Sequence, residues 1–366
     1  MQRATRARHR YAVARSQQGM HMTRTLWLAV LLAAAPCLQA QNWGRAGDPD
    51  AAALEQARIA AHRAQASRLA QALAKAGGAR ELAFAALLQE PMMTTGAVMD
   101  ADAAPSRRAP ADAQATAWLR VAQAKAGNDV LAHQLVIAAT TDDAVRDAAA
   151  RRWQAAEPDN LVPLLSLGLP AEALLAQAAR ATEADVHLYD GVRWMRSVLA
   201  RHPPTPDAQR ALAAGEPFHA DEAAAVAAMA YAAAGMLPSY HALVQACRGT
   251  ALQVSAARAG DCRHVATLLA DRSDNVLGER VGLSMLLELA PRGAERTAIE
   301  ARQRRMDWQM QQWGRLASQQ PRDGAAQFAR LLDDPSIRSE RQLLARVLQE
   351  GGVPPEPPQG WRPPRD

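Results

Sequence analysis

The chain has 366 residues, of which 49% are hydrophobic and only 4% aromatic, and its formal net charge at pH 7 is +5. This length is enough for a large buried core, in two or three ordinary domains or in one elongated repeat array. The positive charge belongs to residues 1–40, which contain six of the 42 basic residues and no acidic one, so the rest carries 36 basic and 37 acidic groups. A near-neutral chain beyond residue 40 disfavours nucleic-acid binding.

The first 40 residues have the parts of a secretory signal peptide. A short charged segment, Met22-Thr-Arg24, precedes the apolar run Leu26–Ala35, and the leader ends in the small residue Ala40. We therefore expect translation to start at Met22, cleavage after Ala40, and a periplasmic or secreted protein with no stable membrane insertion after cleavage. The alternative is a retained membrane anchor, for which this apolar run is short.

After the leader, short apolar-faced segments alternate with Gly, Pro, Asp or Asn, a pattern typical of packed helical hairpins. Residues 51–75 and 80–90 form the first predicted pair, separated by Gly77-Gly78. The next predicted helices cover 112–127, 130–139, 143–157, 171–181 and 185–202. We expect residues 41–202 to form an N-terminal helical array.

Residues 91–110 interrupt this pattern and are expected to form a mobile loop. Met92, Met93 and Met99 lie in the loop, and soft thioether sulfurs could bind Cu(I). Their spacing is irregular, and no His or Cys accompanies them. The sequence therefore favours a linker over a copper site.

The turn around residue 160 shows how consecutive helices of the predicted array are separated. Pro158-Asp159-Asn160 ends one apolar-faced segment, and an apolar run leading to Leu167-Gly168 follows at once. We expect a new helix directly after the turn. The stretch resembles the repeat boundary of tetratricopeptide repeats (TPR), although Pro170 stops the helix earlier than in that family.

Two spacings agree with such a repeat. Trp118 and Trp153 lie 35 residues apart, and the turn residues Asn128 and Asn160 lie 32 apart. The resemblance implies an all-α fold built as an α-hairpin array (an α/α superhelix, TPR-like) whose concave face holds peptide partners.

Pro203-Pro204-Thr205-Pro206 is the sharpest interior breaker and marks the expected boundary before a C-terminal array over 207–350. Helices are predicted there over 207–214, 221–234, 238–247, 262–270, 275–290, 294–319, 328–332 and 337–348. Cys247 and Cys262 are the two cysteines beyond residue 40, and an exported pair favours a disulfide over two buried thiols.

The longest predicted helix, 294–319, carries an apolar stripe of Ile299, Met306, Met310 and Trp313. Trp308 lies off that stripe, near Arg304 and Arg305. We expect Trp313 to be packed inside, and Trp308 to be exposed or covered only by a loop or a partner. Trp308, Arg304 and Arg305 are therefore the candidate partner-binding residues, although such a helix often belongs wholly to the core.

The remaining features bear on function. Residues 351–366 form a proline-rich tail, expected to be extended and mobile. His187 and Asp190 have the spacing of a catalytic dyad, but without a nucleophile or metal partner we expect a solvated surface pair. Phosphate-loop, zinc-protease and nucleophile-elbow motifs are absent from the sequence, so we expect no catalytic site, cofactor or metal.

Two hypotheses follow from these features. The first is an exported scaffold that binds an unknown protein or peptide partner and carries no chemistry. The alternative is a helical enzyme acting on cell-wall or glycan substrates, with a site assembled from residues far apart in the sequence. Acidic residues or histidines converging in a deep cleft would favour the enzyme.

Overall fold

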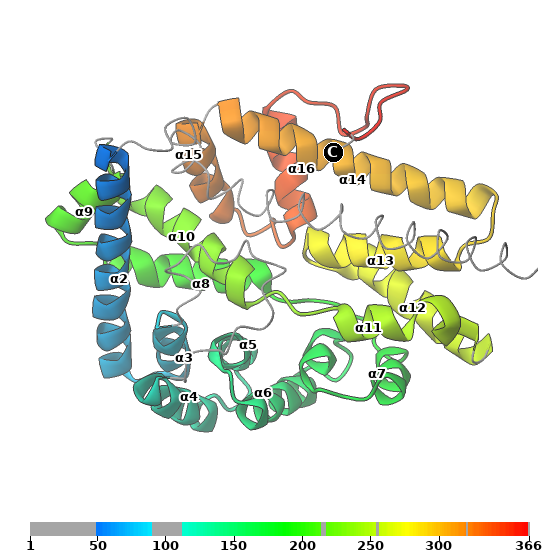
Figure 1. The fold of residues 1–366 in the computed structure, drawn as a ribbon, viewed down its shortest axis with the longest axis horizontal. Helices are drawn as coiled ribbons and strands as arrows, with labels where there is room; N and C mark the ends of the chain where they lie inside the picture. Colours follow the sequence, from blue (N-terminus) through cyan, green and yellow to red (C-terminus); the bar gives the residue numbers. More distant parts are fainter. Residues whose placement is uncertain (1–48, 90–111, 214–216, 254–255, 320, 365–366) are drawn as a thin grey trace, which may run out of the picture.

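The computed structural model describes residues 49–89, 112–213, 217–253, 256–319 and 321–364, and within these ranges the chain is all-α (Figure 1). The described residues form fifteen α-helices and two short 3-10 helices, with two isolated β-bridges and no strand. The predicted all-α class is confirmed. The predicted signal peptide and the loop 91–110 lie outside the described residues. A search of the described helices finds none with the length and apolar character that crossing a membrane requires.

The helices before residue 203 lie close to the predicted ranges, but the predicted partners 171–181 and 185–202 pack mainly on helices after residue 203. Their bounds are α2 Pro49–Ala76, α3 Ala79–Leu87, α4 Ala113–Lys125, α5 Val130–Ala139, α6 Asp143–Ala156, α7 Ala171–Ala178 and α8 Leu188–Arg201. Gly77 has a left-handed φ of 71°, which lets α3 return along α2. Asp112, Asp129 and Asp142 cap α4, α5 and α6, each accepting a backbone N–H from the first turn.

The helices after residue 203 are α9 Pro206–Ala213, α10 Ala220–Gly235, α11 His241–Ala246, α12 Ala256–Arg272, α13 Val276–Leu289, α14 Ala294–Gln319, α15 Pro321–Leu332 and α16 Glu340–Glu350. Helix α7 packs mainly on α11 and α12, and α8 on α10. Both α12 and α15 begin earlier than predicted. The pair α12 and α13 packs closely, because Gly282 has no side chain. A Cβ there would lie 2.4 Å from the backbone nitrogen of Ala270 and 2.6 Å from the oxygen of Ala266. Ser339 forms a capping box with Gln342 at the start of α16.

The helix expected directly after the turn at residue 160 does not form, and that prediction is wrong. The chain makes only a 3-10 helix, η3, over Val162–Ser166. Asn160 is buried, and its side chain donates to the carbonyl of Asp185 and accepts the backbone N–H groups of Asp185 and Val162. These bonds connect the turn to a segment 25 residues further along the chain. The backbone after the turn is held by this connection and does not continue as an α-helix.

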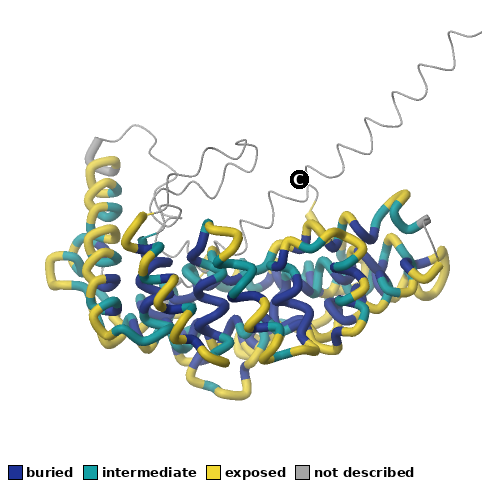
Figure 2. The backbone as a smooth tube through the Cα atoms, turned by 90° about the horizontal axis from the view of Figure 1, so that it is seen from below, coloured by how far each residue is buried: buried dark blue, intermediate teal, exposed yellow. Residues whose placement is uncertain are grey.

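The hydrophobic interior consists mainly of two cores. The first core joins α2–α5 to α8, α10, α15 and α16. Phe84 of α3 lies in it, with ring centroids 5.7 Å from Trp194 of α8 and 5.5 Å from Tyr231 of α10. Both sides of the sequence boundary predicted at 203–206 therefore contribute to this core. Figure 2 shows the buried backbone in the middle of the molecule and the exposed turns around it.

The second core joins α7 and the segment around η3 to α11–α14 and α16. Helix α16 lies between the two cores, because Leu343 and Val347 belong to the first and Leu344 and Leu348 to the second. Helix α14, the long orange-yellow helix in Figure 1, packs on α13, α15 and α16. Its outer side is thus left for the segment that follows α16.

Candidate partner-binding surface on helix α14

Helix α14 presents its two tryptophans to different surroundings. The predicted stripe of Ile299, Met306 and Met310 is buried in the second core. Trp313 is half-buried and packs against both cores, so it contacts the protein interior as expected. Trp308 is half-buried as well, but it lies five positions earlier, about 140° around the helix axis. A different segment of the chain therefore covers Trp308.

That cover is the C-terminal tail. The indole Nε1 of Trp308 donates to the carbonyl of Pro354 at 2.9 Å, and Nε2 of Gln309 donates to the carbonyl of Pro355 at 3.0 Å. The ring of Trp361 meets the ring of Trp308 edge-on, with centroids 5.4 Å apart and planes at 75°. The tail thus touches Trp308 through residues at two different points along its length.

One ion pair accompanies these contacts. Nε of Arg305 lies 2.6 Å from Oε1 of Glu356, and both side chains remain about half exposed. Arg305, Trp308 and Gln309 lie within one turn and face the same segment, and we call these three residues the α14 surface. An exposed ion pair contributes at most about 1 kcal/mol, and an edge-to-face aromatic pair about 0.5–1.5 kcal/mol. The tail is therefore held by several weak contacts.

The end of α16 directs the tail onto this surface. The backbone N–H of Gly351 donates to Val347 and that of Val353 donates to Leu348, at 2.9 Å in both cases, and Gly352 has a left-handed φ of 64°. Val353 then packs against the second core. A second turn, in which the N–H of Trp361 donates to the carbonyl of Pro358, brings Trp361 back to Trp308.

The predicted site residues are thus only partly brought together. Arg305 and Trp308 contact the tail, whereas Arg304 is half-buried and takes no part in the bonds that join α14 to the described tail. Gln309 was missed, although it follows Trp308 in sequence and carries a donor suited to a carbonyl. The tail, expected to be mobile, was not recognised as the segment that covers Trp308.

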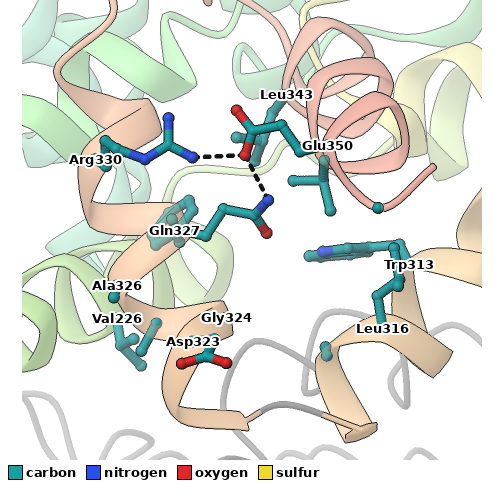
Figure 3. A pocket seen from close by; sticks show the side chains of 15 residues that line it. Val226, Trp313, Leu316, Asp323, Gly324, Ala326, Gln327, Arg330, Leu343 and Glu350 are labelled. Atoms are coloured by element: carbon teal, nitrogen blue, oxygen red, sulfur yellow. Dashed lines mark hydrogen bonds and ion pairs between the residues drawn. The ribbon is translucent and has the colours of Figure 1, made fainter.

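A cavity of about 450 Å³ lies on the Trp313 side of α14, between α10, α14, α15 and α16 (Figure 3). Trp313 and Leu316 line one wall and α16 another. At the rim, the carboxylate of Glu350 accepts hydrogen bonds from Arg330 at 2.5 Å and Gln327 at 2.7 Å. These two bonds lower the pKa of Glu350. Its charge is thus engaged within the protein, beside mostly apolar walls.

The predicted disulfide between Cys247 and Cys262 is confirmed. The two Cα atoms lie 5.5 Å apart, and both residues are buried in the second core. Cys247 ends α11 and Cys262 lies in α12, so the bond encloses η4, Gly249–Gln253. Burial of both sulfurs fits a structural role better than thiol–disulfide exchange, which needs access.

The expected surface pair of His187 with Asp190 forms only as a long contact, because the half-buried His187 is engaged mainly by Glu157. Its Nε2 lies 2.9 Å from Oε1 of Glu157, while Nδ1 is 3.9 Å from Oδ2 of Asp190. Trp153 and Asn160 donate to Oε2 of Glu157 at 2.8 and 2.9 Å. Residues separated by some 30 positions therefore converge on one carboxylate.

The pKa values of this pair shift in opposite directions. Burial raises the pKa of Glu157, but the hydrogen bonds from His187, Asn160 and Trp153 outweigh it, so the pKa is lowered. Burial lowers the pKa of His187, but the charge of Asp185 and the bond to Glu157 outweigh it, so the pKa is raised. Both shifts favour the charged pair.

Asp274, which lies just before α13, also belongs to this cluster. Its carboxylate accepts the backbone N–H of Val186 at 3.1 Å and that of Leu188 at 2.9 Å, at the start of α8. Burial and the negative charge of Asp185 raise the pKa of Asp274 to about 7. His187 itself has a left-handed φ of 54°, uncommon for a residue other than glycine. The cluster therefore fastens the end of α6 and the start of α8 to the segment before α13.

This cluster combines acidic groups with a histidine, which is the kind of arrangement that the enzyme hypothesis requires. Its polar atoms, however, bond to one another and to helix ends. Neither the cavity beside Trp313 nor a second, shallower one beside His219 and Asp333 includes His187 or Glu157.

The chain was also compared with known proteins. Comparison with protein-family models, with curated proteins and with solved structures finds no match in any of the three.

Proposed function

We propose that the protein is an exported helical scaffold that binds a protein or peptide partner, and that the α14 surface is part of its partner-binding face. This role needs no catalytic chemistry and no cofactor. The observation that carries it is the contact between Arg305, Trp308 and Gln309 and a segment without regular secondary structure. A surface that holds such a segment of its own chain has the donors, charge and aromatic ring to hold one from a partner.

The architecture supports the same proposal. Consecutive helices pack as pairs, as α3 does with α4, α5 with α6 and α12 with α13. We propose that these pairs form an α-hairpin array, a TPR-like α/α superhelix, whose extended surface suits peptide partners. The disulfide between Cys247 and Cys262 supports export, because such bonds persist in oxidising compartments.

Capture of partners by the full-length protein in its exporting cell tests this function. The variant carries Arg305→Glu and Trp308→Ala, which remove the charge and the indole donor of the α14 surface. The matched control is Arg120→Glu, an exposed charge reversal on α4. We expect a partner that the wild type and the control retain and the α14 variant loses. Retention of the same partners by all three proteins would contradict a role for α14.

A further inference from the structure

We propose that the α14 surface recognises a proline-rich segment of another protein that carries an acidic residue and a tryptophan, and that the chain's own tail is an internal competitor for that segment. The proposal rests on the proposed function and names the partner chemistry and the regulation of the same site. The tail supplies the template, because its sequence over residues 353–364 is Val-Pro-Pro-Glu-Pro-Pro-Gln-Gly-Trp-Arg-Pro-Pro.

The first argument is the nature of the hydrogen bonds. Trp308 and Gln309 donate to main-chain carbonyls of two successive prolines. A proline-rich segment has few N–H groups and no internal hydrogen bonds, so its carbonyls stay available to outside donors. Donation from an aromatic side chain to such carbonyls is a general way of recognising an extended proline-rich peptide. Any chain that presents consecutive proline carbonyls can therefore satisfy the same two donors.

The second argument concerns specificity. Arg305 lies one turn before Trp308 and pairs with Glu356, directly after the two prolines whose carbonyls are bound. Trp361 then contacts the ring of Trp308 from the other end of the segment. The surface thus selects a carboxylate next to the proline pair and an aromatic ring five residues later. The segment contacts Trp308 near its start, through Pro354, and near its end, through Trp361.

The third argument is that the tail is tethered but weakly held. Of residues 353–364 only Val353, Pro357 and Trp361 are half-buried, and the others are exposed. Only Gly351 and Gly352 lie between α16 and the segment 353–364, and so short a connection gives an effective concentration on the order of millimolar. A weak ligand is enough to occupy the site under those conditions. A segment from a partner must displace it, so tail release would regulate binding.

A direct binding measurement tests the proposal. The probe is a fluorescein-labelled synthetic peptide of residues 353–364, titrated with full-length protein and followed by fluorescence anisotropy. The wild type is compared with a full-length variant whose tail is released by Glu356→Arg and Trp361→Ala, both at sites on the tail itself. Far-UV circular dichroism and an intact disulfide establish that the variant is folded.

We expect the released variant to bind the probe about tenfold or more tightly than the wild type does, because the tethered competitor is gone. Adding Trp308→Ala to the released variant is expected to abolish binding. A second probe with the same two tail substitutions is expected to bind at least about tenfold more weakly than the first.

Three results would overturn the proposal. Equal binding by wild type and released variant would show that the tail does not compete. Absence of binding by the folded released variant would show that the surface holds the tail only through its tether. Equal binding of the two probes would show that the α14 surface recognises neither the carboxylate nor the tryptophan. Partner capture that depends on Trp308 would survive each of these results, so the proposed function is tested separately.

Discussion

The indole nitrogen of Trp308 donates a hydrogen bond to the carbonyl of Pro354, 46 residues further along the chain. This one bond joins the middle of the longest helix of the C-terminal half to the start of the tail. Because the neighbouring Gln309 makes the corresponding bond to Pro355, the two donors fix the segment's position on α14. The predictions below separate this contact from the packing of the core.

Substitution of the two tryptophans of α14 should have unequal effects on stability. Trp313→Ala removes a ring that packs against both cores, and we expect the free energy of unfolding to fall by about 2–4 kcal/mol. Because Trp313 already borders a cavity, we expect this loss of stability to be smaller than the largest losses caused by truncating fully buried side chains. Trp308→Ala removes contacts with a largely exposed tail, and Trp308 belongs to neither core, so we expect a loss of about 1 kcal/mol or less.

Urea denaturation of the two variants, followed by circular dichroism, measures this difference. Equal destabilisation would place both tryptophans in the core and remove the argument for a binding surface on α14.

Removal of the disulfide should destabilise the fold without changing its architecture. The two cysteines are 15 positions apart, a loop for which chain entropy predicts a contribution of about 3 kcal/mol. We expect the double variant Cys247→Ser and Cys262→Ser to unfold at lower urea concentration than the oxidised wild type. A count of two free thiols in denatured, unreduced wild-type protein isolated after export would contradict the bond.

The His187–Glu157 pair should make stability depend on pH. The pKa of His187 is raised above its ordinary 6.5, so its contribution is complete below that pH and is lost as the pH rises through the folded value. The pKa of Glu157 is lowered below 4.5, so its contribution is present above that pH and is lost only in stronger acid. The pair therefore contributes most to stability between pH 4.5 and pH 6.5.

His187→Gln tests this dependence against wild type in urea melts at pH 5.5 and pH 8.5. We expect the variant's deficit to be larger at pH 5.5, where His187 is charged. Asp185, Asp190 and Asp274 also face the cluster and are present in both proteins, so the difference between the proteins isolates His187. A deficit that is the same at both pH values would mean that the histidine acts without its charge.

Much of the fold could be predicted because its signals are local. Helix α14 was predicted over its observed range, since its apolar stripe repeats over many turns, and the aspartate caps follow from single residues. The disulfide followed from counting cysteines. The missing helix after Asn160 could not be predicted, because the bonds that replace it come from residues 25 positions away.

The candidate site shows the same limit. The offset of Trp308 from the apolar stripe marked it as a surface residue, which the structure bears out in part. Its cover could not be inferred, because Trp308 and Gln309 bind main-chain carbonyls, which carry no sequence signal. Proline-rich composition predicted an extended tail, and composition alone says nothing about where such a tail docks.

The central claim, that the α14 surface binds the tail segment, is tested most directly by fluorine NMR of full-length protein labelled with 5-fluorotryptophan. The chain has eight tryptophans, and Trp308→Phe assigns the resonance of Trp308. Because the ring of Trp361 lies 5.4 Å from that of Trp308, we expect Trp361→Ala to shift this resonance and Arg120→Glu on α4 to leave it in place. A Trp308 resonance that stays unchanged in Trp361→Ala would contradict the account.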